Sequence, residues 1–297
     1  MTSIHDKPAS GFKIAASIEA TPRQVIDADA LTGLFPLGTR VYLTDIGGPF
    51  GEIGVAARRL AAAGYRPVPH FAARRIASRT ELLARLEILT GESGVEEAMV
   101  VAGSPARPEG PYSSSIDLLR TGLFDAHKIR HIGVAGHPEG SPDIPPEAIA
   151  AAITEKNAIA RDSDARFRIV TQFGFEAGRF IDWAEALARQ GNALPIHVGV
   201  AGPAKITTLL KYAAICGVGA SMDFLKKRAS SLVALSTSYS PEAVVGPIEA
   251  YVAEHPAAPI RQIHVFPFGG LRRSAEWLAE RGSWFSGDAD AELDVIG

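Results

Sequence analysis

The sequence predicts an α/β protein with the (β/α)8 TIM-barrel fold. Short apolar segments alternate with helical segments eight times along the 297 residues, close to the ~250 residues that such barrels usually need. The apolar segments lack the polar–apolar alternation of half-exposed strands, which favours strands covered on both faces. An open doubly wound sheet is the main alternative, but no GxGxxG motif follows the first strand, and the alternation continues to eight.

Eight strands are predicted where these apolar segments occur. They span residues 13–18, 40–43, 66–68, 97–102, 132–135, 168–171, 194–200 and 262–266. Helices are predicted over residues 21–34, 52–63, 115–123, 147–160, 180–189 and 274–281, in a segment that begins at 78, and as two or three helices within 205–254. Thr21 before Pro22, and Ser78 before Glu81, are typical of helix starts because their hydroxyls cap free backbone amides.

The composition excludes several classes of function. With a net charge of −3 and no basic block, the chain has no electrostatic feature that would bind nucleic acid or an anionic membrane. No stretch reaches the roughly 18 apolar residues of a membrane span, and residues 1–10 lack an apolar signal segment, so we predict a cytoplasmic protein. The single cysteine, Cys216, lies in an apolar run and is predicted to pack in the core without a disulfide.

One catalytic domain is predicted. Residues 12–282 form the barrel, residues 1–11 a flexible N-terminal tail, and residues 283–297 an acidic C-terminal tail. A homo-oligomer is compatible with this organisation, and the sequence alone does not decide the oligomeric state.

Candidate functional residues follow from the fold, because TIM-barrel active sites lie at the C-terminal ends of the strands. The residues at or just after the predicted strand ends are Glu19, Thr44, Asp45, His70, Ser104, His137, Glu139, Gln172 and residues 268–270. No lysine is among them, which disfavours a Schiff-base aldolase. Asp45, His70 and His137 lack the HxH or HExxH spacing of many metal sites, so no metal is predicted.

Several candidates also have a purely structural explanation. Glu19 suits the first turn of a helix, where the macrodipole favours a carboxylate. Ser104 is typical of a loop or a helix cap, and Phe175 is typical of a core. Gly269 and Gly270, followed by Arg272, form either a phosphate cradle or an ordinary helix entry.

The order of these motifs resembles the methylenetetrahydrofolate reductase family. Residues 135–143 (AGHPEGSPD) are similar to the family's strand-five turn, A-x-Y-P-E-x-H-P-E, and residues 170–175 (VTQFGF) to I-T-Q-x-x-F at the end of strand six. Glu19, Thr44 and His70 occupy the places of the family's glutamate, V-T and histidine at the ends of strands one, two and three. The similarity extends over residues 12–280.

The resemblance implies a folate-dependent oxidoreductase of one-carbon metabolism and methionine biosynthesis. By it, Glu19 is the general acid that protonates the five-membered ring of methylenetetrahydrofolate, which opens to an iminium that a hydride reduces to the N5-methyl group. Burial at an apolar barrel mouth favours the protonated carboxyl that this step needs. The resemblance also assigns Gln172 to the pterin edge, Phe175 to a stacking contact, and Thr44 and Ser104 to the substrate.

The family takes its hydride from FAD reduced by NAD(P)H, which implies both cofactors here. His70, Gly103, His137 and Lys156 are the residues at the family's flavin positions. The chain departs from the family at residues 102–104, where AGS replaces R-G-D, and at His137, which replaces the tyrosine that covers the flavin.

Three alternatives therefore stay open beside a flavin-dependent reductase. The first is a reductase in which NAD(P)H delivers its hydride directly to folate. The second is a phosphate-binding barrel lyase or isomerase that uses residues 269–272 (GGLR). The third is a barrel that binds folate without catalysis.

Overall fold

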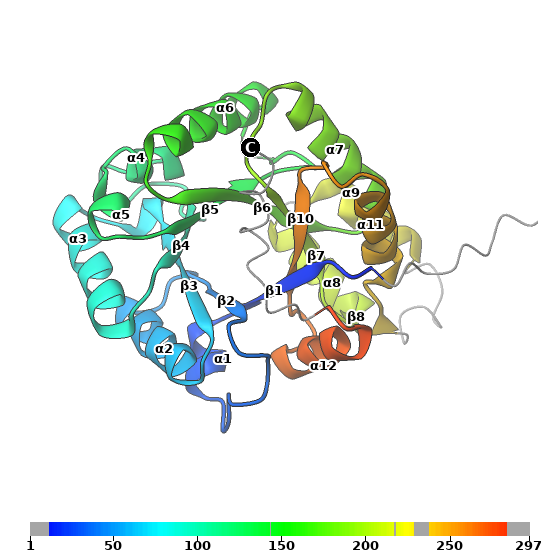
Figure 1. Cartoon of the computed structure of the whole chain (residues 1–297), viewed down its shortest axis with the longest axis horizontal. Coiled ribbons are helices and arrows are strands. Elements are labelled where there is room, and N and C mark those ends of the chain that lie inside the picture. Colours follow the sequence, from blue (N-terminus) through cyan, green and yellow to red (C-terminus); the bar gives the residue numbers. More distant parts are fainter. Residues whose placement is uncertain (1–11, 143, 217, 229–237, 284–297) are drawn as a thin grey trace, which may run out of the picture.

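The computed structural model describes residues 12–142, 144–216, 218–228 and 238–283 of the chain. Eight parallel strands close into a barrel in the order β1-β10-β7-β6-β5-β4-β3-β2, and most of the helices surround it (Figure 1). The barrel strands are β1 (Ala15–Ala20), β2 (Arg40–Leu43), β3 (Arg66–Ala72), β4 (Glu97–Val101), β5 (His131–Gly136), β6 (Arg166–Gly174), β7 (Ile196–Ala201) and β10 (Ile260–Phe266). The predicted TIM-barrel fold is confirmed.

The α-helices overlap the predicted segments with shifted ends, except that the short helix Leu123–Ala126 lies almost wholly beyond the segment predicted to end at residue 123. They are α1 (Pro22–Ile26), α2 (Phe50–Ala62), α3 (Arg79–Glu87), α4 (Ser115–Leu119), α5 (Leu123–Ala126), α6 (Pro146–Asp162), α7 (Ala177–Arg189), α8 (Ile206–Cys216), α9 (Gly219–Arg228), α11 (Glu242–Glu254) and α12 (Leu271–Arg281). A 3-10 turn, η1 (Ala73–Arg75), follows β3, and a π-helical turn, η2 (Ile88–Glu92), extends α3. The predicted terminal tails and the side chain of Cys216 lie outside the described residues.

Helix α1 is shorter than predicted, although its start forms as expected. Thr21 and Gln24 make a reciprocal capping box, yet the helix ends at Ile26 rather than continuing to residue 34. Side chains from α2 and from the loop after it donate hydrogen bonds to the backbone carbonyls beyond Asp27 and at the end of α1. Arg59 donates to the carbonyl of Ile26, and the Tyr65 hydroxyl donates to the carbonyl of Leu31 at 2.6 Å. Tertiary hydrogen bonds therefore replace the helical ones in this segment.

Strands β3 and β6 are longer than predicted, which matters for the site. Residue 70 lies inside β3 and residue 172 inside β6, so both side chains are held by barrel strands rather than by loops. Sites on strands are positioned more rigidly than sites on loops.

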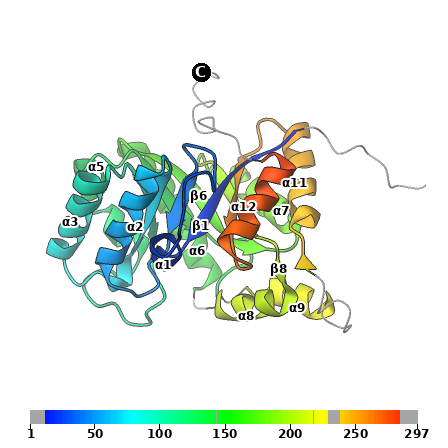
Figure 2. The ribbon, with the colours of Figure 1, turned by 90° about the horizontal axis from the view of Figure 1, so that it is seen from below.

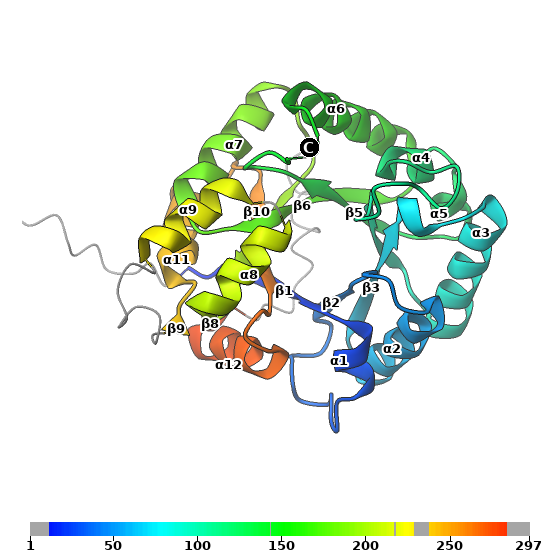
Figure 3. The same cartoon turned by 180° about the vertical axis from the view of Figure 1, so that it is seen from behind.

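A second, smaller core covers one side of the barrel's C-terminal mouth. Helices α8 and α9 lie across that end of the barrel, on the side of β7 and β10 (Figures 2 and 3). A two-stranded antiparallel sheet, β8 (Ala204–Lys205) with β9 (Ser238–Tyr239), joins this cap. The cap buries apolar side chains against the ends of β6 and β7, among them Phe173, Ala201 and Leu209. In the described part of the chain, no helix is both long and apolar enough to cross a membrane.

Candidate active site

Glu19 lies between two histidines at the C-terminal end of the barrel interior. Its Oε2 atom is 3.8 Å from Nε2 of His70 and 3.6 Å from Nε2 of His264. The three side chains come from β1, β3 and β10. Glu19 is 18% exposed and His264 only 1%, so the carboxyl group reaches the mouth while the imidazole of His264 lies below it.

His264 is held from beneath by two barrel neighbours. Ser17, two residues before Glu19 on the same face of β1, shares a 3.0 Å hydrogen bond with Nδ1 of His264. The ring of Tyr42 packs against the His264 ring with centroids 4.4 Å apart, and it meets His70 edge-on at 6.2 Å. These contacts fix both imidazoles relative to Glu19 and leave their Nε2 atoms facing its carboxyl group.

The surroundings of His70 favour its neutral form. Burial lowers its pKa below the ordinary value, and the nearby His264 lowers it further, against the opposing effect of the Glu19 and Asp45 carboxyls. A neutral histidine can hydrogen-bond to Glu19 or to a ligand without placing a positive charge there.

Three of the predicted site residues carry a buried polar atom without a hydrogen-bond partner among the described residues. They are Thr44 Oγ1, His70 Nε2 and Gln172 Oε1. Buried polar groups in proteins are nearly always paired, because an unpaired one costs about 1–3 kcal/mol. All three lie at the C-terminal ends of their strands, so this mouth has the polar groups of a ligand site.

A β-bulge sets the direction of Gln172. Between β6 and β7 the register places two residues, Thr171 and Gln172, opposite one residue of the partner strand. Gly199 of β7 allows this close approach, because a Cβ there would lie 2.4 Å from the Gln172 carbonyl oxygen. The amide of Gly199 then donates to Thr171 Oγ1 at 2.8 Å.

Aromatic rings form one wall of the mouth. Phe266 of β10 packs edge-on against His264 at 4.9 Å, and Phe173 packs against Phe268 at 4.8 Å. Phe175, predicted to stack on the substrate, is 3% exposed and lies among the rings of the cap, stacked on Phe224. Because protein rings occupy its surroundings, Phe175 packs the cap, and the partly exposed Phe266 is the ring next to the Glu19 cluster.

The acidic residues that flank the cluster are engaged in structural contacts. Asp45 accepts a 3.2 Å hydrogen bond from Arg85, and its carboxyl still acts on His70, whose pKa it raises. Glu139 accepts two hydrogen bonds from Ser221, at 2.6 Å and 3.0 Å, and so joins the β5 turn to α9. Among the described residues, no three His, Cys, Asp or Glu side chains are placed to hold a metal ion.

The residues predicted to hold FAD do not fit its phosphates. Lys156 is buried and its Nζ donates to the carbonyl of Ala135 at 2.9 Å. Burial, followed by the Lys156 ammonium, lowers the pKa of His137 to about 4, so His137 is neutral. A Cβ at Gly103, whose φ is +88°, would lie 2.9 Å from the Ala72 Cβ, so this glycine serves local packing. Among these residues the cation is Lys156, which is buried and donates to a backbone carbonyl, so none of them presents an accessible cation to a flavin phosphate.

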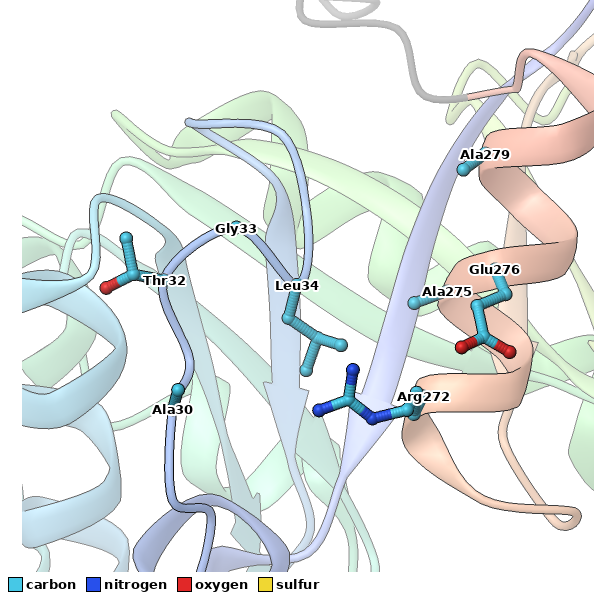
Figure 4. Close-up of a pocket in the computed structure, with 8 residues that line it drawn as sticks. All are labelled: Ala30, Thr32, Gly33, Leu34, Arg272, Ala275, Glu276 and Ala279. Atoms are coloured by element: carbon cyan, nitrogen blue, oxygen red, sulfur yellow. The ribbon is translucent and has the colours of Figure 1, made fainter.

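The residues of the predicted phosphate cradle after β10 do not converge on one site. A Cβ at Gly269 would lie 1.9 Å from the Pro203 carbonyl oxygen, so Gly269 is needed for close packing of two loops. Arg272 lines a separate cavity of about 350 Å³ between α12 and the loop after α1, opposite Leu34 (Figure 4). Arg273 donates to Ser238 of the cap sheet. The two arginines therefore point to different partners.

Sequence reasoning missed Ser17 and His264, because it considered only residues at or beyond the predicted strand ends. Each lies two residues before a residue at the strand end and on the same face of the strand: Ser17 precedes Glu19, and His264 precedes Phe266. The period of two along a strand is the signal that could have found them. The remaining prediction, Ser104, is an exposed residue whose hydroxyl accepts a hydrogen bond from Arg75 at 3.3 Å.

No known protein-family profile matches the chain. Among solved structures, an uncharacterised protein from Clostridium thermocellum that binds two copies of 5-methyl-5,6,7,8-tetrahydrofolic acid is similar, with a TM-score of 0.57. It is 13% identical, and the match covers 91% of this chain and 95% of that one. The GH20 β-N-acetylhexosaminidase from Streptomyces coelicolor A3(2) has a TM-score of 0.42 at 13% identity, covering 95% of this chain and 67% of that one. At these identities, the first likeness establishes a shared barrel fold.

Proposed function

We propose that the protein is a folate-dependent oxidoreductase that interconverts 5,10-methylenetetrahydrofolate and 5-methyltetrahydrofolate. The observation that carries this proposal is the placement of Glu19 at the mouth, between His70 and His264. The polar atoms of Thr44 and Gln172 that have no partner in the described part of the chain support a polar ligand above it. The fold likeness to a barrel that binds 5-methyltetrahydrofolic acid supports a reduced folate as that ligand.

The reaction requires one proton and one hydride. Glu19 donates its proton to N10 of the bound methylene compound, the bond between N10 and the bridging carbon breaks, and its electron pair stays on N10. The bridging carbon is then an iminium carbon on N5, and a hydride converts it to the methyl group. Glu19 regains its proton from solvent, so each turnover consumes one hydride and one proton.

The residues around Glu19 have supporting roles in this scheme. His264, buried and tied to Ser17, orients the carboxyl group from below. The lowered pKa of His70 disfavours a positive charge beside Glu19. The carboxamide of Gln172 suits the alternating donors and acceptors of the pterin edge, and the rings near Phe266 provide an apolar contact for its face.

The hydride donor in this proposal is a reduced nicotinamide, NADH or NADPH. FAD would supply a flavin hydride carrier if it bound, but the predicted residues do not fit its phosphates, and no step above depends on it. The visible spectrum of the purified protein tests this directly. We expect no flavin bands, and bands of oxidised flavin would show that other residues bind it.

Turnover is tested by following oxidation of NADH or NADPH that depends on methylenetetrahydrofolate. The proposal predicts such oxidation with the wild-type protein. A protein that binds the folate but never consumes the nicotinamide, and never oxidises methyltetrahydrofolate with an artificial acceptor, would be a binding barrel without catalysis.

A further inference from the structure

Arg75 lies at the rim of the mouth, on the turn that directly follows β3. Its Nη2 donates to Ser104 in the loop after β4, and its guanidinium lies against Gly47 in the loop after β2. Three loops that follow neighbouring strands therefore meet at this side chain. They lie on the side of the mouth formed by β2, β3 and β4, whereas α8 and α9 lie over β7 and β10 (Figure 3).

The charge of Arg75 is not matched by a carboxylate in the described part of the chain. Its hydroxyl partner Ser104 is neutral, and its Nε atom is buried without a hydrogen-bond partner there. Asp45, two residues before Gly47 in the loop after β2, is instead paired with Arg85 at 3.2 Å. A partly buried guanidinium without a counter-ion has the donors that a phosphate or carboxylate group accepts.

The turn that carries Arg75 is held by hydrogen bonds that do not use its guanidinium. Arg74, its neighbour, donates from its backbone amide to the Ala102 carbonyl at 2.9 Å and from Nε to the Ser113 carbonyl at 2.9 Å. Arg85 donates to the Arg75 carbonyl at 3.2 Å. The cation is therefore positioned before any ligand binds, which lowers the entropy cost of binding.

Gly47 leaves space for the guanidinium of Arg75 because it has no side chain. Its φ is +103°, and a Cβ at this position would lie 2.7 Å from Nη1 of Arg75. Any side chain here would displace the guanidinium. Gly48, the next residue, has no such constraint, because a Cβ there would make only an ordinary contact with Glu52 at 3.5 Å.

We propose that Arg75, Ser104 and Gly47 form an anion subsite that binds a phosphate or carboxylate group of a ligand held in the mouth. For the nature of that ligand, this inference rests on the proposed function. Two sources have the required chemistry: the pyrophosphate of a nicotinamide dinucleotide and the glutamate carboxylates of a folate. In either case Arg75 sets where the charged end of the ligand lies, while Glu19 and Gln172 contact its ring or its reaction partner.

The test compares three probes by isothermal titration calorimetry at low salt. ADP-ribose carries the pyrophosphate, 5-methyltetrahydrofolate carries the carboxylates, and 6-methyltetrahydropterin carries the ring alone. Arg75→Met is expected to weaken ADP-ribose or 5-methyltetrahydrofolate about tenfold, as loss of a charge-assisted hydrogen bond would, and to leave the tetrahydropterin unchanged. The weakened probe identifies the source.

Gly47→Ala is the sharper variant, because it keeps the arginine and moves it. It is expected to weaken the same probe as Arg75→Met, whereas Gly48→Ala is the matched control and should bind all probes like wild type. Arg58→Met, which removes an exposed arginine paired with Glu92, controls for loss of charge alone.

Two results would overturn the subsite: unchanged binding of all probes in Arg75→Met, or an equal loss for all three, which indicates general damage to the mouth. Failure of the proposed function is separate. It would appear as wild-type protein that binds neither pterin probe, and in that case ADP-ribose and inorganic pyrophosphate still report on Arg75.

Discussion

The N-terminal end of the barrel, here called the floor, and the C-terminal mouth differ in how their buried polar groups are paired. At the floor, Glu97 of β4 accepts hydrogen bonds from Arg40 at 2.9 Å and from Arg168 at 2.7 Å. At the mouth, Thr44, His70 and Gln172 each keep a buried polar atom without a partner in the described residues. In TIM barrels the N-terminal face contributes stability and the C-terminal face carries chemistry.

The pKa of Glu97 reflects this pairing. Burial alone would raise it, but the guanidiniums of Arg168 and Arg40 outweigh burial and lower it to about 2. Arg168 also donates to the hydroxyl of Tyr42 at 2.8 Å, and the Tyr42 ring packs under His264. The ion pairs of the floor thus support the residues that position Glu19. We therefore expect mutation of Glu19 to lower activity and mutation of Glu97 to lower stability.

The largest effect is expected for Glu19→Gln. The variant keeps the shape of the side chain but cannot donate the proton, so kcat should fall about a thousandfold, within the range typical of a lost general acid. Its melting temperature and its affinity for folate should stay close to those of wild type. Stopped-flow assays and thermal melts check both, and a near-normal kcat would remove Glu19 from the role of acid.

Glu97→Gln should show the reverse pattern. Removing this carboxylate takes away the negative charge that two buried guanidiniums share, which costs about 3–5 kcal/mol of unfolding free energy. Urea denaturation measures it, with Glu92→Gln as the control, because the exposed Arg58–Glu92 pair contributes under ~1 kcal/mol. An equal, small loss in both variants would mean that the floor network contributes no special stability.

The sequence was sufficient for the barrel and for bringing several candidate residues to one mouth. The eight apolar segments became the eight strands, and Glu19 and His70, 51 positions apart along the chain, meet because their strands end at the same mouth. Strand ends are readable from glycine, proline and polar residues that follow apolar runs. Thr44 and Gln172 were found for the same reason.

The buried ammonium of Lys156, which has no carboxylate partner among the described residues, is expected to make the free energy of unfolding depend on pH. Burial lowers the pKa of Lys156 from its ordinary value of 10.5 to about 8. Between pH 8 and 10.5 the unfolded chain binds more protons at this site than the native protein, so the free energy of unfolding should rise with pH across that window. Below pH 8 both states are protonated, and the full cost of burying the ammonium is present.

Lys156→Met tests this sign. The difference in unfolding free energy, wild type minus variant, should shift in favour of wild type by about 2.5 kcal/mol between pH 7 and pH 10. Urea titrations at several pH values measure it. A difference that does not change with pH would show that Lys156 keeps an ordinary pKa in the native protein.

A smaller effect is expected for Gln172→Ala. Loss of one hydrogen bond to the pterin should raise the dissociation constant of folate about tenfold. The melting temperature should stay equal or rise, because the substitution removes a buried amide oxygen that has no partner among the described residues. A large loss of stability would instead mean that Gln172 is part of the folding core.

The features that the sequence did not predict depend on side-chain contacts rather than on local pattern. The bulge at Thr171–Gln172 shows only in the register with β7, and the rings that surround Phe175 belong to the cap, whose helices α8 and α9 the crossover pattern leaves unplaced. Arg75 follows a strand that is longer than its apolar run indicates, so its place at the rim was hidden. Each miss concerns where an element ends or what covers it.

We propose that a folate binds the polar atoms of the mouth that lack a partner among the described residues. Calorimetric titration of the wild-type protein with 5-methyltetrahydrofolate tests this binding, with sugar phosphates titrated in parallel. We predict saturable binding of the folate in the micromolar range, weakened in Gln172→Ala and retained in Glu19→Gln, with no binding of sugar phosphates. The absence of folate binding up to millimolar concentration, or preferential binding of a sugar phosphate, would contradict the account.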